Sequence, residues 1–271
     1  MKIAIQGIRG SFHHIVAQNY FGKDITLVEC LSFSEIPDLI ISGEVDYGIM
    51  AIENSIAGAI LSNYSLIDEN NLAIAGEYYL NIQHNLMGLA SQDLSEISEV
   101  RSHPMALLQC RKFFKNHPHI KLVEDVDTAD VAKRIEEKSI KGVGAIASEL
   151  AAEEYNLEII ESSIQTVKEN QTRFVILEGK ESKNEFLPNK SSIKFGLEHR
   201  KGGLGDVLTR IAANNVSLTK IQSLPVIDNP WEYEFFADLI FENFNDYKNA
   251  LIDIKDEVKS YKILGEYKQN K

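Results

Sequence analysis

Two apolar runs, Gly48-Ile49-Met50-Ala51-Ile52-Glu53-Asn54-Ser55 and Gly142-Val143-Gly144-Ala145-Ile146-Ala147-Ser148, decide the fold. Each has the composition of a buried strand and ends in polar residues. In open α/β sheets, ligands bind beyond the carboxyl ends of the strands. The repetition therefore predicts two similar lobes that face each other across a ligand-binding cleft. Chance similarity between two buried strands is the alternative.

The residues around both runs alternate between strand and helix patterns, which is typical of a parallel sheet covered by helices. The expected elements before and at the first run are a strand at 2–6, a turn at 7–11, a helix at 13–20, a strand at 25–28, a helix at 34–41 and a strand at 47–52. A helix capped by Asp127 or Thr128 precedes the second run, and Ser148 opens another helix. Segments 79–89 and 172–177 are strand-like, so we expect them to cross between the lobes.

A different pattern follows residues 178–191, which are polar, contain Pro188 and lack periodicity, and which we interpret as a linker. The elements expected beyond it are strand 193–197, helix 204–213, strand 216–221, strand 233–240, helix 247–257 and strand 261–264. This order, βαββαβ, is the ferredoxin-like pattern.

Bulk properties narrow the classes of partner. The chain has 271 residues, 44% of them hydrophobic, and a formal net charge of -12. Such an excess of negative charge argues against nucleic acid and against anionic membranes as partners. Cys30 and Cys110 are too few for a disulfide framework and are predicted to be buried, and residues 1–5 enter a strand pattern without a signal-like leader. We therefore expect a cytoplasmic protein.

Four polar islands carry the chemistry: Asn170-Gln171-Thr172-Arg173-Phe174, Gly7-Ile8-Arg9-Gly10-Ser11-Phe12, Ile52-Glu53-Asn54-Ser55-Ile56-Ala57-Gly58 and His103-Pro104-Met105-Ala106-Leu107-Leu108-Gln109-Cys110. The first island sets a hydroxyl, a permanent cation and an aromatic ring side by side, which suits a small anionic ring. In this order the islands resemble prephenate dehydratase. Residues 191–271 resemble the ACT regulatory domain that follows the catalytic domain in that family.

The resemblance implies a two-lobe, periplasmic-binding-protein-like catalytic domain at 1–180 and an ACT domain at 191–271. It also implies the conversion of prephenate to phenylpyruvate, water and carbon dioxide in L-phenylalanine biosynthesis, with feedback by L-phenylalanine. Aromatisation drives the reaction, so positioning, electrostatics and proton delivery suffice and we expect no cofactor and no metal. A homodimer or homotetramer is expected.

By the same resemblance, Thr172 is the hydroxyl that hydrogen-bonds the departing oxygen, Arg173 binds a substrate carboxylate and Phe174 walls the ring. The alternatives are strand propensity for Thr172, an exposed or structural ion pair for Arg173 and core packing for Phe174. The residues expected to bind substrate are Gly10, Ser11, Phe12, Asn54, Ser55 and Gln109. Ser11 can instead simply cap a helix, Asn54 can fix a turn, and Gln109 can belong to a structural helix that Pro104 opens. We expect His13 to be a surface or capping histidine.

The expected allosteric residues are Gly202, Gly203, Leu204, Gln222, Ser223, Leu224 and Pro225. Gln222 and Leu224 replace two charged residues of the family motif, whereas Trp231-Glu232-Tyr233 and the glycine turn are present. Three rival functions stay open: an arogenate dehydratase, a non-catalytic ligand sensor of the same fold, and a regulatory ACT protein with an inactive first domain.

Overall fold

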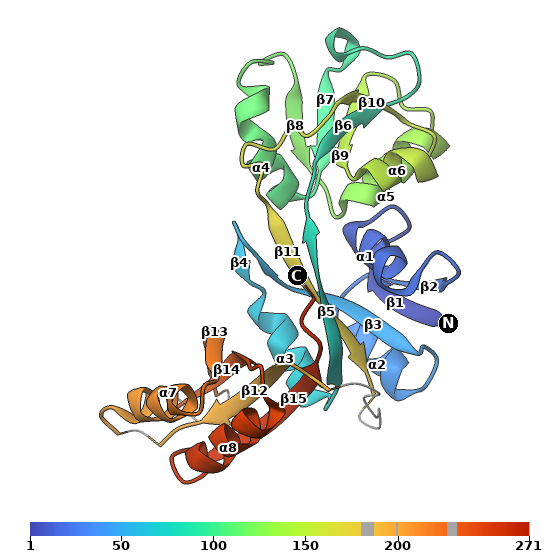
Figure 1. Cartoon of the computed structure of the whole chain (residues 1–271). Helices are drawn as coiled ribbons and strands as arrows, with labels where there is room; N and C mark the ends of the chain where they lie inside the picture. Colours follow the sequence, from blue (N-terminus) through green and yellow to red (C-terminus); the bar gives the residue numbers. More distant parts are fainter. Residues whose placement is uncertain (180–186, 199, 227–231, 271) are drawn as a thin grey trace. The chain divides into compact units, whose positions relative to one another are not determined.

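The computed structural model describes residues 1–179, 187–198, 200–226 and 232–270 (Figure 1). Contacts divide the chain into two compact units, each discontinuous in sequence. The first comprises Met1–Ala59 and Tyr79–Phe174, and the second comprises Ile60–Tyr78 and Val175–Lys271. The chain therefore passes from one unit to the other after Ala59, Tyr78 and Phe174.

The first sheet has the order β2-β1-β3-β11-β5, with β4 paired to β3. Its strands are β1 (Lys2–Gln6), β2 (Thr26–Cys30), β3 (Tyr47–Asn54), β4 (Gly58–Ala59), β5 (Ala73–Asn81) and β11 (Gln171–Glu178). The helices of this part of the chain are α1 (Phe12–Phe21), α2 (Glu35–Ile41) and α3 (Leu61–Glu69). β1 pairs in parallel with both β2 and β3, as the alternating pattern predicts.

The second sheet has the order β10-β6-β9-β7-β8. Its strands are β6 (Asn85–Gly88), β7 (Glu99–Ser102), β8 (Lys121–Glu124), β9 (Val143–Ala147) and β10 (Glu158–Glu161), and η1 (Leu94–Glu96) is a short 3-10 turn. Helix α4 (Pro104–Phe114) covers one face, and α5 (Thr128–Glu137) and α6 (Glu149–Glu154) cover the other (Figure 1). Neighbouring residues of β9 point to opposite faces, since Ala145 packs with the α5 side and Ile146 with the α4 side.

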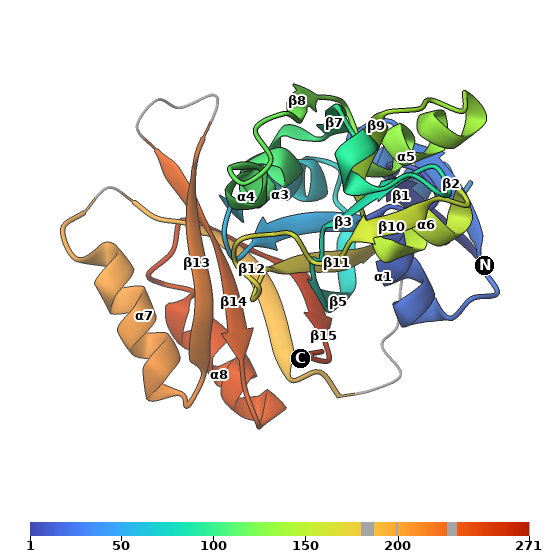
Figure 2. The same cartoon turned by 90° about the horizontal axis from the view of Figure 1, so that it is seen from above.

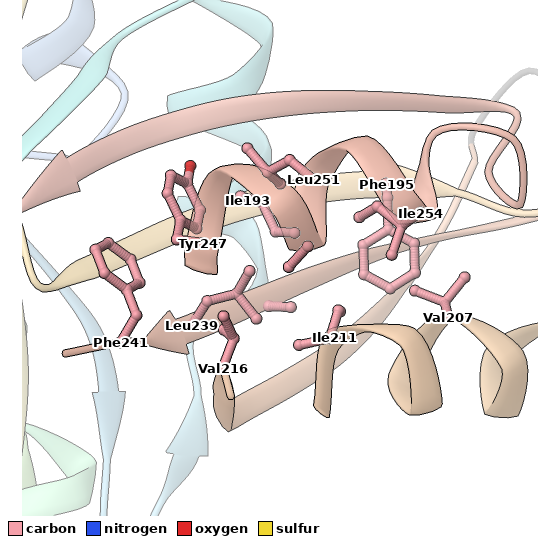
Figure 3. Packing of buried hydrophobic residues seen from close by; sticks show 12 residues of the cluster. Ile193, Phe195, Val207, Ile211, Val216, Leu239, Phe241, Tyr247, Leu251 and Ile254 are labelled. Atoms are coloured by element: carbon pink, nitrogen blue, oxygen red, sulfur yellow. The ribbon is translucent and has the colours of Figure 1, made fainter. Parts of the chain in front are cut away.

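The third sheet is antiparallel, with the order β13-β14-β12-β15. It contains β12 (Lys190–Gly196), β13 (Ser217–Pro225), β14 (Tyr233–Ile240) and β15 (Ser260–Tyr267), with α7 (Gly203–Ala213) and α8 (Phe244–Ile254). The two helices lie side by side against the sheet (Figures 2 and 3). Phe195 and Leu239 of the sheet and Tyr247 of α8 are fully buried in the core between the helices and the sheet (Figure 3). The predicted βαββαβ order is confirmed.

Several local predictions are confirmed. Asp127 caps α5 by accepting from the amides of Ala129 and Asp130, and Ser148 caps α6. Cys30 and Cys110 are free and buried, and burial raises their pKa values, to about 11 and about 12.

Among the described residues, no helix combines the length and apolar character that a membrane crossing requires.

Three predictions need correction. The segment 178–191, interpreted as a linker, includes the end of β11 at Glu178 and the start of β12 at Lys190, and its residues 180–186 lie outside the described residues. The strand-like segment 79–89 is two strands, because β5 ends at Asn81 and β6 begins at Asn85. Ser34 stands at the start of α2, but its side chain makes no capping hydrogen bond. Its hydroxyl lies instead 2.7 Å from that of Ser32.

Candidate active site

The predicted catalytic hydroxyl belongs to Thr172, the second residue of β11, and it is buried with 8% exposure. Asn54, the last residue of β3, donates from Nδ2 to Thr172 Oγ1 over 2.9 Å. Asn54 is oriented from its other side, because its Oδ1 accepts from the amides of Ile56 at 2.9 Å and Ala57 at 2.8 Å. Asn54 therefore fixes the turn after β3, which is the structural role named as its alternative, and it also binds the Thr172 hydroxyl.

Ser55 fastens the same turn to β11. Its amide donates to the carbonyl of Gln171 over 2.8 Å, and its Oγ accepts from the amide of Gln171 at 3.0 Å. Two backbone-directed bonds thus hold the Asn54–Ser55 turn beside Thr172.

Gln109 reaches the same place from the second lobe. It projects from α4, and its Oε1 accepts from Asn170 Nδ2 at 2.9 Å. The Oδ1 of Asn170 in turn lies 2.7 Å from Asn54 Nδ2. His84, between β5 and β6, places Nε2 2.9 Å from Gln109 Oε1. The lobes are therefore joined through polar side chains, of which Asn170 and His84 are buried and Asn54 and Gln109 are partly buried.

The glycine-containing turn at 10–12 lies against the second lobe. Gly10 has φ +82°, and a Cβ on it would lie 2.8 Å from Ala151 Cα. Its carbonyl accepts from Ser148 Oγ at 2.5 Å. Ser11 caps α1 by accepting from the amide of His14 at 3.2 Å. Phe12 sets its ring against that of His84, with centroids 5.6 Å apart and an interplanar angle of 81°.

His13 differs from expectation, because it is buried rather than at the surface. Its ring packs edge-on against Phe174, with centroids 4.9 Å apart, and against Phe33 at 5.4 Å. Burial lowers the pKa of His13 from 6.5 to about 3, so the imidazole is neutral at physiological pH. Phe174 is itself 1% exposed and packs in the core.

Arg173 lies between Thr172 and Phe174 in β11, and successive strand residues point to opposite faces. Its guanidinium carbon is 6.0 Å from the ring centroid of Tyr79, a cation–π geometry. The side chain is buried, with 3% of the residue exposed. The structure thus brings Asn54, Ser55 and Gln109 to Thr172, while Arg173 extends from the other face of β11.

Two polar residues of this network had no role in the sequence-based prediction. Asn170 is the first residue of the Asn170-Gln171-Thr172-Arg173-Phe174 island but was given no role of its own, and His84 is a polar residue within the crossing segment 79–89. The available signals were the place of Asn170 in the same island as Thr172 and the histidine in a strand-like crossing segment. The described residues contain no group of three or more His, Cys, Asp or Glu side chains placed to hold a metal ion.

In the second unit, a cavity of about 520 Å³ lies beside the predicted allosteric residues. Its described lining consists of Leu197, Glu198, Arg200, Leu204, Glu232, Tyr233, Phe235 and Lys259. Gly202, with φ +82°, precedes α7, and Leu204 in its first turn reaches the cavity. Trp231 lies outside the described residues.

The other predicted allosteric residues lie on β13. Ser223 and Pro225 pair in register with Phe235 and Tyr233 of β14, which line the cavity. Gln222 and Leu224 lie on the same strand, and none of the four predicted residues of β13 belongs to the described lining. The structure therefore places Leu204 at the cavity, and Gln222, Ser223, Leu224 and Pro225 on the neighbouring strand.

Comparison with known proteins decides the family. The family model described as prephenate dehydratase matches residues 3–182. The chain belongs to the prephenate dehydratase family. A bifunctional chorismate mutase/prephenate dehydratase of Enterobacter agglomerans is 31% identical over 271 residues, which cover 98% of this chain and 70% of that protein. The predicted enzyme, a prephenate dehydratase of L-phenylalanine biosynthesis, is confirmed.

Solved structures confirm the fold class. A prephenate dehydratase of Arthrobacter aurescens, solved in complex with L-Phe, has a TM-score of 0.87 at 23% identity, over 99% of this chain and 90% of that one. GqqA, described as a novel type of quorum quenching acylase, has a TM-score of 0.90 at 26% identity, over 100% of this chain and 98% of that one. The prephenate dehydratase fold is therefore shared with a protein described by another activity.

Proposed function

We propose that Thr172 donates the hydrogen bond that assists departure of the ring hydroxyl of prephenate. The observation that carries this proposal is the 2.9 Å bond from Asn54 Nδ2 to Thr172 Oγ1. Because the hydroxyl oxygen accepts from Asn54, its own hydrogen is available to donate to another oxygen. A donor aimed at the leaving oxygen stabilises the negative charge that develops there.

The reaction needs little more than this donor and correct positioning. The bond from the ring to its carboxylate breaks and releases carbon dioxide, and the electron pair enters the ring. The opposite carbon–oxygen bond breaks, and the departing hydroxide takes up a proton to leave as water. Formation of the aromatic ring supplies the driving force, so a weakly acidic alcohol can orient or relay the proton without transferring it fully before bond cleavage.

The other roles follow from the chemistry of the side chains. The residues proposed to bind substrate are Gly10, Ser11, Phe12, Asn54, Ser55 and Gln109. Phe174 is proposed to form a hydrophobic wall beside the substrate ring. We assign Arg173 to a substrate carboxylate. Prephenate carries two carboxylates at a distance from its ring hydroxyl, so a cation and a hydroxyl on opposite faces of β11 need not contact the same substrate atom.

The test of Thr172 compares two substitutions. Thr172→Val should lower kcat by at least about 100-fold, the usual scale of positioned proton donors, while a substrate analogue binds within about tenfold of wild type. Thr172→Ser, the matched control, keeps the hydroxyl and should retain most turnover. The measurement is phenylpyruvate formation from prephenate, with arogenate supplied in a parallel reaction. A fully active valine variant would remove the proposed role, and faster turnover of arogenate would reassign the substrate.

We also propose that L-phenylalanine binds the 520 Å³ cavity of the second unit. Leu197, Leu204 and Phe235 offer apolar surface for an aromatic ring. Two of the cavity's charged residues are paired with each other, since Lys259 Nζ lies 3.0 Å from Glu232 Oε2. No ion pair involves Glu198 among the described residues, which leaves its carboxylate suited to an ammonium group.

Calorimetric titration with L-phenylalanine tests this assignment. We expect saturable heat for the wild type and an affinity lower by roughly tenfold for Glu198→Gln, the scale of one charge-assisted hydrogen bond. Glu242→Gln removes an exposed carboxylate outside the described lining and should bind as wild type does. Absence of any heat with the wild type would contradict L-phenylalanine as the effector.

Three broader assignments accompany these. We propose residues 1–180 as the catalytic domain and 191–271 as the ACT regulatory domain, in a homodimer or homotetramer. The exposed edge strand β13 supports such an assembly, because an edge strand can pair with another chain. The cytoplasm is the proposed compartment, in keeping with the two free thiols.

A further inference from the structure

Five polar side chains form one continuous hydrogen-bonded chain between the two lobes of the first unit. In order they are Thr172, Asn54, Asn170, Gln109 and His84. The four contacts measure 2.9, 2.7, 2.9 and 2.9 Å. We call this chain the polar relay. It ends at the proposed catalytic hydroxyl on one side and at a histidine without an assigned role on the other.

The direction of the relay is fixed at Asn54. Its Oδ1 accepts from the amides of Ile56 and Ala57, and backbone amides can only donate. The Nδ2 group must therefore face Thr172 and Asn170. It follows that Asn170 presents Oδ1 to Asn54 and Nδ2 to the next member of the relay. The oxygen and nitrogen of a side-chain amide are usually assigned from the surrounding hydrogen bonds. Here the two main-chain donors, Ile56 and Ala57, determine the assignment for Asn54 and, through it, for Asn170.

The same logic fixes the tautomer of His84. Asn170 donates from Nδ2, so Gln109 must offer Oε1 as the shared acceptor. His84 can then approach that oxygen only as a donor, which requires the hydrogen on Nε2. The Nδ1 atom of a neutral His84 is consequently unprotonated, and it is buried without a hydrogen-bond partner among the described residues. Burial lowers the pKa of His84 and so favours the neutral form of its ring. The hydrogen bond to Gln109 partly opposes this shift.

We propose that His84, as its Nε2–H tautomer, is a positioning residue for the dehydration step. Its donor holds the carbonyl of Gln109 toward Asn170, and the relay in turn holds Asn54 against Thr172 Oγ1. The edge contact of its ring with Phe12 ties the same histidine to the proposed substrate-binding turn. This inference rests on the proposed role of Thr172.

Two substitutions separate the donor from the bulk of the ring. The amide nitrogen of Gln in His84→Gln can occupy the Nε2 position, whereas the shorter Asn in His84→Asn reaches only the Nδ1 position. We expect His84→Asn to lower kcat by roughly tenfold or more, the scale of one lost buried hydrogen bond, with KM changed by less than about threefold. His84→Gln should restore kcat to within about threefold of wild type.

A spectroscopic measurement tests the relay without turnover. Two-bond ¹⁵N–¹H correlation spectra of histidine-labelled enzyme identify the tautomer, and the signal absent from both His84 variants assigns His84. We expect the Nε2–H pattern near neutral pH. An Nδ1–H pattern, or His84→Asn with wild-type kcat, would overturn the proposal. Were the wild type inactive toward prephenate, the proposed function would fail, while the tautomer would still report on the relay.

Discussion

At the residue scale, His13 shows how burial changes a familiar side chain. It is packed between two aromatic rings, and its pKa falls from 6.5 to about 3. Between these pH values the unfolded chain binds a proton at this position and the native protein does not. The contribution of His13 to stability is therefore full above about pH 6.5 and is lost as the pH falls toward 3, by up to about 1.4 kcal/mol for each pH unit.

The prediction is that His13→Met lessens the acid sensitivity of folding. The free energy of unfolding, measured by urea denaturation near pH 7 and near pH 4, should fall by less in this variant than in wild type. His119→Gln, which changes an exposed histidine, is the matched control and should follow the wild-type curve. An identical pH dependence for His13→Met and wild type would contradict the buried neutral state.

The resemblance to prephenate dehydratase predicted that Asn54, Ser55 and Gln109 lie near Thr172, and their hydrogen bonds show that they do, but the orientations of the side chains were not predicted. The Thr172 and Asn54 islands are brought together because both stand at ends of neighbouring strands of one sheet. The side chain of Arg173 points away from that of Thr172 because successive residues of a strand face opposite sides of the sheet. A motif treated as three adjacent residues does not take this alternation into account. The burial of His13 depends on Phe33 and Phe174, which are distant in sequence.

At the scale of elements, the turn between β1 and α1 depends on Gly10. Its φ of +82° is unfavourable for other residues, and its missing Cβ makes room for Ala151 of α6. Gly22, which ends α1, has φ +88°, but apart from its neighbours in the chain no atom of the described residues lies within 4 Å of where a Cβ would be. Substitution of Gly22 therefore tests backbone strain alone, whereas substitution of Gly10 tests backbone strain together with the close contact to Ala151.

We expect Gly22→Ala to cost about 1–3 kcal/mol, from backbone strain alone. Gly10→Ala should cost about 1–3 kcal/mol more, because the added methyl group overpacks the contact with α6. Chemical denaturation of the two variants measures the difference. Equal losses would show that the contact between the turn and α6 yields without cost.

Local sequence patterns predicted the regular helices and strands well, but they did not predict where a strand is interrupted. The strand at Tyr233–Ile240 has the predicted bounds, because alternation and β-branched or aromatic composition both continue to its ends. The break between β5 and β6 was missed, since residues 82–84 include the apolar Ile82 and carry no glycine or proline. Tertiary hydrogen bonds determine that break: the amide of Ile82 donates to the carbonyl of Asn170 over 2.6 Å.

At the scale of the whole molecule, a fully buried ion pair lies within the second unit. Lys190 Nζ lies 2.7 Å from Glu77 Oε2, with side-chain exposures of 2% and 0%. Lys190 begins β12, whereas Glu77 belongs to β5, 113 residues earlier. The fold shared with GqqA indicates that architecture alone does not set the reaction. The Lys190–Glu77 pair joins two segments of the second unit that are far apart in the sequence.

The expected cost of Lys190→Met is about 3–5 kcal/mol, because the buried carboxylate of Glu77 would lose its ion pair with Lys190. Lys259→Met disrupts the exposed pair with Glu232, with side-chain exposures of 53% and 44%, and should change stability by no more than about 1 kcal/mol. Thermal and urea unfolding of the purified variants give both values. Similar effects of the two substitutions would show that burial adds nothing to the Lys190 pair.

The discontinuous second unit has a consequence for how the chain acquires its structure during synthesis. Asp68 at the end of α3 contacts Lys194 and, 194 residues away in sequence, Lys262. On the ribosome, α3 emerges long before either cation exists, so its charged face must stay hydrated until almost the last strand has been translated. Such distant pairing delays folding and prolongs the exposure of incompletely packed surface. Nascent chains stalled before Lys194, in which Asp68 has neither cation, should therefore be the ones that chaperones must hold.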